Sequence, residues 1–148
     1  MRGTNWIRLA LCGCVAGVVW NLLSAVFLYV FAPDFVASVQ KGALYPPQGG
    51  GFFYAVDVVM GIWAIWLYSA IAPRYGTKPT TAAIAAVAWW TIKSLQSAKW
   101  AGLGFVPQGV GLIPLAALSL VAAVVAVATG ARLYDKVDTP GPKVLPAV

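Results

Sequence analysis

The sequence contains no histidine and no glutamate. Without them, haem ligation by imidazole, proton transfer through histidine and di-metal carboxylate sites are excluded for side chains of this chain. The sequence also has no glycine-rich phosphate loop between a strand and a helix, and no serine placed beside a base. We therefore expect no catalytic residue, no metal site and no cofactor held by side-chain ligands, and we predict that the protein is not an enzyme. A lipid or pigment bound without such ligands remains open.

Charged residues are also scarce, at 9% of the chain, whereas 61% of the residues are apolar. A soluble domain has roughly 25% charged residues. The apolar residues gather in four runs, each about 20 residues long, which as a helix spans a hydrocarbon core of roughly 30 Å. None of the runs alternates with the period of a barrel strand. The runs cover about residues 6–31, 52–72, 82–103 and 110–131.

These runs predict an all-α fold, namely a membrane-embedded antiparallel four-helix bundle, because the bilayer core offers backbone groups no hydrogen-bond partners. Residues 1–134 form one transmembrane domain in this interpretation, and residues 135–148, which are rich in proline, form a mobile cytoplasmic tail.

Basic residues mark the orientation of these helices. Seven of them lie near the start of the chain, between the second and third runs, or after the fourth run, whereas the first and third loops together contain only Lys41. The positive-inside rule therefore predicts that both termini and the loop 73–81 are cytoplasmic. Because the cations are scattered, we expect no nucleic-acid binding. The seven are Arg2, Arg8, Arg74, Lys78, Arg132, Lys136 and Lys143.

Two of these loop cations, Arg74 and Lys78, are candidate contacts for lipid phosphates or for a cytoplasmic partner. The alternative is that they only anchor the topology. In the same loop, Pro73 is expected to stop the second helix, and Thr80 or Thr81 to cap the third.

The first loop, residues 32–51, is long enough to contain a short helix. Asp34 is a plausible N-cap, and Phe35, Val36 and Val39 recur near helical spacing. Such a helix would lie along the outer membrane surface. An irregular loop is the alternative.

Polar residues inside the apolar runs form the candidate site. Lys93 falls near the middle of the third run, where an unpaired ammonium costs at least about 2.5 to 3.5 kcal/mol. We expect it to pair with Asp57, the acid within the second run. The helix depths bring five residues together in the outer half of the bundle: Asn21, Asp57, Lys93, Gln96 and Lys99.

Two interpretations of this intramembrane polar cluster remain open. It is either an interhelical clamp, in which Lys99 could replace Lys93 as the partner of Asp57, or a hydrated pocket for a proton, an ion or a polar head group. Gly13 and Gly17 share the first helix with Asn21 and form a small-xxx-small surface, which permits close approach of another helix.

Three stretches of the chain carry a resemblance to a known group of proteins. They are WLYSAIAPRYGTKPTTA at residues 66–82, AGVVWN at 16–21 and GARLY at 130–134. The chain resembles small uncharacterised bacterial four-helix membrane proteins that share a Leu-Tyr-x-Ala-Ile-x-Pro-Arg-aromatic-Gly loop. The resemblance implies this topology and a bacterial cytoplasmic (inner) membrane, and it implies no mechanism.

Two functional hypotheses follow. The first is a non-catalytic accessory subunit or scaffold, whose partners are the lipid bilayer and either other membrane subunits or further copies of the chain. The second is a small oligomeric transporter or channel, in which Asp57 and Lys93 line the path.

Overall fold

The computed structural model describes residues 5–41, 49–102 and 112–136, and these are folded into five helices without a strand. The prediction of an all-α fold is therefore confirmed. The predicted mobile tail lies outside the described residues from position 137 onwards, as do parts of the first and third loops. The helices are α1 (Trp6–Phe31), α2 (Pro33–Gln40), α3 (Gly49–Tyr75), α4 (Pro79–Gly102) and α5 (Leu112–Lys136).

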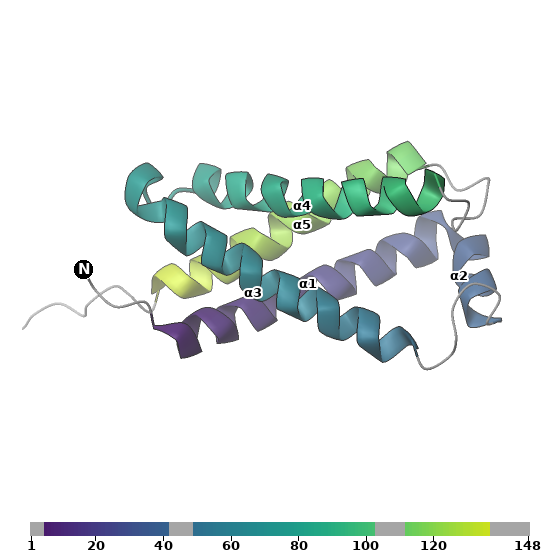
Figure 1. Ribbon diagram of the computed structural model, residues 1–148, viewed down its shortest axis with the longest axis horizontal. Helices are drawn as coiled ribbons and strands as arrows, with labels where there is room; N and C mark the ends of the chain where they lie inside the picture. The colour runs from purple at the N-terminus through teal and green to yellow at the C-terminus, as the bar shows by residue number, and fades with distance from the viewer. Residues whose placement is uncertain (1–4, 42–48, 103–111, 137–148) are drawn as a thin grey trace, which may run out of the picture.

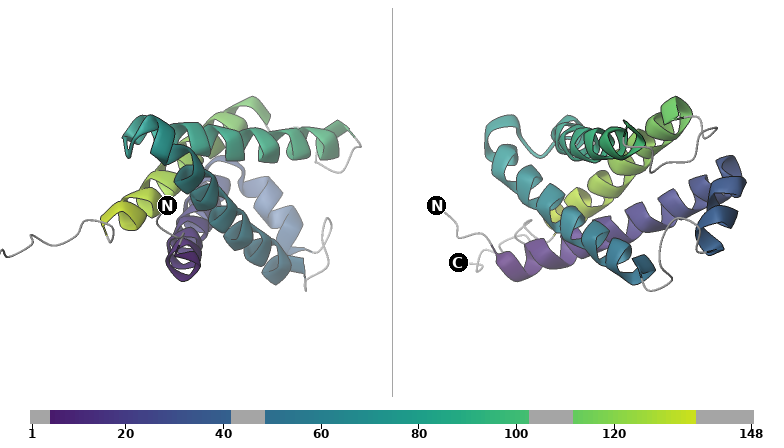
Figure 2. Two further views of the ribbon diagram at one scale, coloured as in Figure 1. Left: turned by 60° about the vertical axis from the view of Figure 1, so that its left-hand side comes forward. Right: turned by 45° about the vertical axis from the view of Figure 1, so that its right-hand side comes forward.

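Four long helices, α1, α3, α4 and α5, pack around one apolar core, and the short α2 lies at the end of the molecule where α1 finishes (Figure 1). The helix α3 returns to the end where α1 begins, α4 leaves from there, and α5 comes back to it (Figures 1 and 2). The start of α1, the turn between α3 and α4, and the end of α5 thus lie together. These are the segments that carry Arg8, Arg74, Lys78 and Arg132.

The close approach of α1 and α3 depends on glycine. A Cβ atom on Gly17 would lie 2.5 Å from the Cα of Val58, and one on Gly61 would lie 2.5 Å from the carbonyl oxygen of Gly13. Real Cβ atoms do not approach backbone atoms this closely, so only glycine fits the crossing. The predicted small-xxx-small surface of α1 is therefore the surface that packs against α3.

Alanine has the same role between α4 and α5. Ala85 and Ala86 of α4 and Ala122, Ala123 and Ala126 of α5 are completely buried. Small side chains on both helices let their backbones come close. The helices are then held by dispersion contacts between closely packed backbones and methyl groups, without large interdigitating side chains.

The end of α3 differs from the sequence prediction. Pro73 does not stop this helix, which continues to Tyr75. Proline is tolerated here because it lies in the last turn. It removes one backbone hydrogen bond, and no further turns follow that it could disrupt. The helix ends instead at Gly76, whose φ of +81° suits glycine and whose N–H donates to the carbonyl of Ala72 at 2.8 Å.

The start of α4 also differs from the prediction. This helix begins at Pro79, so neither Thr80 nor Thr81 is its N-cap. Proline suits a first helical position because its φ is already helical and no partner for an N–H is needed there. Thr81 instead donates its hydroxyl to the carbonyl of Gly76 at 2.7 Å, which fixes the turn between α3 and α4.

The first loop does contain a short helix, α2, as predicted, but the helix begins at Pro33, so Asp34 lies in its first turn and is not its N-cap. The side-chain amide of Gln40 donates to the hydroxyl of Tyr29 on α1 at 3.3 Å, which ties the end of α2 back to α1.

Within the described residues, three helices are long and apolar enough to cross a membrane: α1, α3 from Gly51 onwards, and α5 from Ile113 onwards. The apolar runs of the sequence predicted four such helices. The helix α4 is long, but Lys93, Gln96 and Lys99 lower the apolar character of its second half. Large apolar side chains are exposed on all four long helices; Ile7 of α1 and Ile113 of α5 are 76% and 84% exposed, and Leu95 of α4 is 67% exposed.

Candidate functional site

The centre of the candidate site is an ion pair between α3 and α4. The Nζ of Lys93 contacts the Oδ1 of Asp57. The side chains are 30% and 17% exposed respectively, so the four long helices cover the pair only in part. Asp57 lies in the first half of α3 and Lys93 in the second half of α4, so the pair is far from the turn that joins these helices. The two helices diverge from that turn (Figures 1 and 2). The long stem of the lysine spans the widening space between them.

A tryptophan of α1 completes the surroundings of this pair. The indole Nε1 of Trp20 donates to Oδ2 of Asp57 at 3.2 Å, so each carboxylate oxygen has a partner. The Nζ of Lys93 also lies 4.8 Å from the centre of the Trp20 ring, within cation–π range. One residue from each of three helices therefore contributes to a single charge-neutral cluster.

A second tryptophan supports the first from α4. The rings of Trp20 and Trp89 are 5.0 Å apart and tilted by 43°. Trp89 is completely buried, and its Nε1 has no hydrogen-bond partner among the described residues. The Cα atoms of α1 and α4 stay more than 8 Å apart throughout these residues. The two indoles and the stem of Lys93 therefore fill the space between helices whose backbones do not meet.

The other residues of the predicted cluster do not join the ion pair. Asn21 is half-buried and has no hydrogen bond to Asp57 or Lys93. Gln96 and Lys99 are exposed, so Lys99 does not replace Lys93 as the partner of the carboxylate. Helical spacing places Gln96 on the same face as Trp89. Toward the end of α4 this face is not covered by α3, because α3 diverges from α4 there (Figure 2).

The hydrogen bond from Trp20 to Asp57 was not predicted from the sequence. The available signal was its spacing. Trp20 follows Gly13 by seven residues, which places it on the face of α1 that packs against α3.

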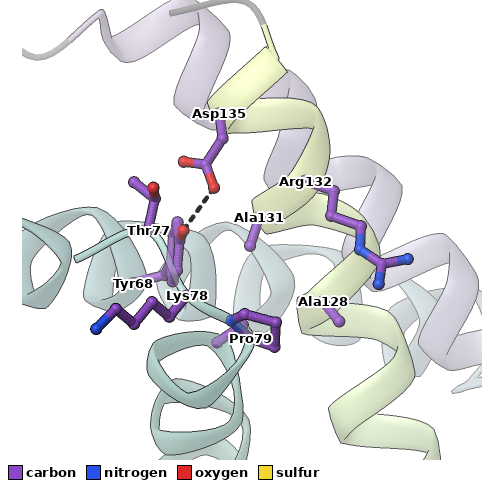
Figure 3. Close-up of a pocket in the computed structure, with 9 residues that line it drawn as sticks. Tyr68, Thr77, Lys78, Pro79, Ala128, Ala131, Arg132 and Asp135 are labelled. Carbon is purple, nitrogen blue, oxygen red and sulfur yellow. Dashed lines mark hydrogen bonds between the residues drawn. The ribbon is translucent and has the colours of Figure 1, made fainter. Parts of the chain in front are cut away.

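A pocket of about 210 Å³ lies at the opposite end of the molecule, between the end of α3, the start of α4 and the end of α5. At one side of it, the hydroxyl of Tyr68 donates to Oδ2 of Asp135 at 2.7 Å (Figure 3). Two cations, Lys78 and Arg132, extend from opposite sides, and both are exposed. The remaining lining residues are Thr77, Pro79, Ala82, Ala128 and Ala131.

The two loop residues predicted to contact a lipid or a partner have different surroundings. Lys78 lines this pocket. Arg74 is exposed and stacks over the ring of Tyr75 at 5.8 Å. Asp135 was not predicted to be helical, because the predicted helix ended at residue 131. The described α5 continues to Lys136 and brings Asp135 to Tyr68.

Among the described residues, no group of three or more histidine, cysteine, aspartate or glutamate side chains is arranged to hold a metal ion. Comparison with known proteins finds no match to the chain among protein-family models, curated proteins or solved structures. The features that bear on function are therefore the geometry of the ion pair, of the surface around it and of the pocket.

Proposed function

We propose that the protein is a non-catalytic integral membrane protein, an accessory subunit or scaffold of a membrane assembly. It forms an antiparallel four-helix bundle in a bacterial cytoplasmic membrane, with both termini cytoplasmic. Three apolar helices of spanning length and the large exposed apolar side chains on their outer faces support the membrane location. The grouping of the basic segments at one end of the fold supports the orientation.

The observation that carries the assembly role is the exposed polar surface of α4. Gln96 and Lys99 are exposed, and Lys93 is partly exposed beside them. Counting back from the end of the helix at Gly102, Gln96 lies about 9 Å deep and Lys93 about 14 Å deep. The stem of Lys99 can reach the interface, but an amide at the depth of Gln96 would face acyl chains if nothing covered it.

Polar side chains inside a membrane nearly always face protein or a water-filled space. We infer that another transmembrane helix, from a partner subunit or a second copy of the chain, packs on this surface and supplies hydrogen bonds to Gln96. In this proposal the Asp57 and Lys93 pair is a clamp. It joins α3 to α4, with Trp20 adding α1, and thereby presents the surface in a fixed geometry.

The test is native mass spectrometry of the full chain purified from membranes in a mild detergent. We expect a stoichiometric companion or a homodimer. The Gln96→Leu variant should lose most of this association, because the substitution replaces the amide with an apolar side chain of similar size that cannot form hydrogen bonds. Gln40→Leu on α2 is the matched control and should associate like the unsubstituted chain. A chain that is monomeric and without a companion before any substitution would contradict the proposal.

A second candidate function is a small oligomeric transporter or channel. The partial exposure of Lys93 and Asp57, 30% and 17%, favours it, because water or an ion could reach the pair from the uncovered side. Flux measured in proteoliposomes decides between the two roles. Solute or proton flux that is lost in Asp57→Asn, while the variant stays folded and oligomeric, supports transport. Unchanged leakage supports the clamp.

A further inference from the structure

The pocket between the ends of α3 and α5 contains charges of both signs that do not neutralise one another. Lys78 and Arg132 form no ion pair with any residue of the described ranges, and Asp135 pairs with neither of them. In Figure 3, the carboxylate of Asp135 lies on one side of the pocket, and the side chains of Lys78 and Arg132 extend from two other parts of the rim, with their charged ends pointing away from each other. A ligand that carries one negative and one positive group would satisfy both.

The carboxylate of Asp135 is held in place. Tyr68 is 1% exposed, and its hydroxyl donates to Oδ2 of Asp135, which orients the carboxylate. The other oxygen, Oδ1, has no donor among the described residues and can accept a hydrogen bond from a ligand. A primary ammonium fits this oxygen, since it is a compact charged group with three donors.

The two cations suit a phosphate. Arginine can bind phosphate oxygens through two parallel hydrogen bonds, and lysine binds them as a point charge. Both side chains are exposed, and because their charged ends point apart in Figure 3, binding one phosphate requires them to change rotamer toward the pocket mouth. A phosphate between Lys78 and Arg132, with an ammonium at Asp135, corresponds to a phosphoethanolamine group.

The position of the pocket favours a lipid as the source of this group. If the protein spans the membrane as proposed, the pocket lies at the cytoplasmic interface, where head groups are found. Apart from Thr77, its remaining lining is apolar, with Ala82 and Ala131 almost completely buried. The volume of about 210 Å³ is below that of pockets for drug-sized ligands, and it suits a head group rather than a whole lipid.

We infer that this pocket binds the head group of a phospholipid that carries a phosphate and a primary amine, through Lys78, Arg132 and Asp135. This inference rests on the proposed membrane location, and it is independent of the proposed assembly partner. Choline lipids should bind less well. A quaternary ammonium has no N–H to donate and is recognised by cages of several aromatic rings, whereas Tyr68 is the one aromatic residue among those that line the pocket.

The experiment is native mass spectrometry of the full chain, delipidated in detergent and titrated separately with phosphatidylethanolamine, phosphatidylcholine and phosphatidylglycerol. Soluble O-phosphoethanolamine is titrated in parallel. We expect phosphatidylethanolamine to bind about tenfold more tightly than either other lipid, because its ammonium adds one charge-assisted hydrogen bond to Asp135. Tighter binding of the lipid than of the soluble group would identify the membrane as the source.

Variants separate the two halves of the site. Asp135→Asn should remove the preference for phosphatidylethanolamine and keep binding of phosphate-bearing lipids. The double variant Lys78→Gln/Arg132→Gln should weaken all three lipids by about tenfold or more. Arg74→Gln removes a nearby exposed cation outside the pocket lining and should bind like the unsubstituted chain.

Equal binding of phosphatidylcholine and phosphatidylethanolamine would overturn the inference, as would a double variant that binds like Arg74→Gln. Equal affinity for soluble O-phosphoethanolamine would overturn its lipid part. Alkaline carbonate extraction tests the membrane location separately. A chain that is not embedded in the membrane would be released by this treatment. Loss of a protein companion in detergent would affect the proposed function and leave these titrations unchanged.

Discussion

Trp20 on α1 and Asp57 on α3 are joined by a hydrogen bond of 3.2 Å from the indole Nε1 to the carboxylate Oδ2. The other carboxylate oxygen receives Lys93 from α4. A single acidic side chain thus connects three helices, two of which, α1 and α4, have no close backbone contact within the described ranges. Removing any member of this cluster should therefore change how α4 is held against the other helices.

Replacing Trp20 with phenylalanine tests the hydrogen bond alone. The substitution keeps an aromatic ring beside Lys93 and removes the donor to Asp57. We expect a loss of about 1 kcal/mol in the free energy of unfolding. For a chain of this size, that loss lowers the melting temperature by roughly 2 to 4 °C, measured in detergent. Trp66→Phe, at a 42% exposed position on α3, is the control and should change the melting temperature less. Equal shifts would contradict the role given to Trp20.

Replacing Asp57 with asparagine tests the ion pair. The variant leaves Lys93 charged and only partly solvated, and we expect a loss on the order of 2 kcal/mol in the free energy of unfolding. Adding Lys93→Gln should recover part of this loss, because no unpaired charge then remains. Thermal unfolding of the two single variants and the double variant measures the coupling energy. Strictly additive losses would show that the two side chains do not interact.

Replacing Gly17 with alanine tests the crossing of α1 and α3. The new Cβ would lie 2.5 Å from the Cα of Val58, and backbone atoms cannot move aside as a flexible side chain can. We expect a destabilisation of about 1 to 3 kcal/mol, seen in thermal unfolding. Gly51→Ala places the same methyl group where no atom lies within 4 Å, so it should be neutral or slightly stabilising. A neutral Gly17→Ala would mean that the helices are farther apart than described.

Replacing Tyr68 with phenylalanine tests the connection between α3 and the end of α5. The hydroxyl that donates to Asp135 is lost, and the ring stays in the core. Amide hydrogen exchange in the last turn of α5 should then become roughly several-fold faster, because that turn loses its side-chain tie to α3. Tyr75→Phe, at a 52% exposed position, serves as the comparison. Unchanged exchange near Asp135 would show that α5 is held there by packing alone.

Fusion reporters test the predicted orientation. A fluorescent protein that matures only in the cytoplasm should fluoresce when it is attached to the C-terminus, because the basic residues predict that this end is cytoplasmic. The same reporter placed between α2 and α3 should remain dark. The reverse pattern would invert the topology and move the pocket around Asp135 to the other side of the membrane.

The length of the apolar runs was sufficient to predict the four long helices, and helical depth was sufficient to place Lys93 near Asp57. These features depend on the composition of single segments. The end of α3 was misplaced because the short helical extension after Ala72 depends on Gly76, whose left-handed conformation closes the last turn. The general tendency of proline to end a helix, applied to Pro73 alone, does not take the conformation of Gly76 into account.

The remaining errors concern the angles between helices. Gln96 was expected beside Lys93 because both share a face of α4, but a linear sequence does not show that α3 diverges from that face. The contact between Tyr68 and Asp135 was missed for a related reason, since it requires α5 to extend one further turn and to meet α3 there. Tertiary geometry, rather than local propensity, decides both.

The limited apolar character of α4 has a consequence for how the protein is made. This helix leaves the ribosome after α1 and α3, which carry Trp20 and Asp57. If the chain spans the membrane as proposed, the counter-charge of Lys93 is already present in the chain when α4 reaches the translocon, and a helix that is costly to insert alone would enter beside the carboxylate that neutralises it. In that case the order of synthesis would be part of the folding mechanism. A circular permutant that began with α4 should insert poorly, although it would contain every contact of the finished fold.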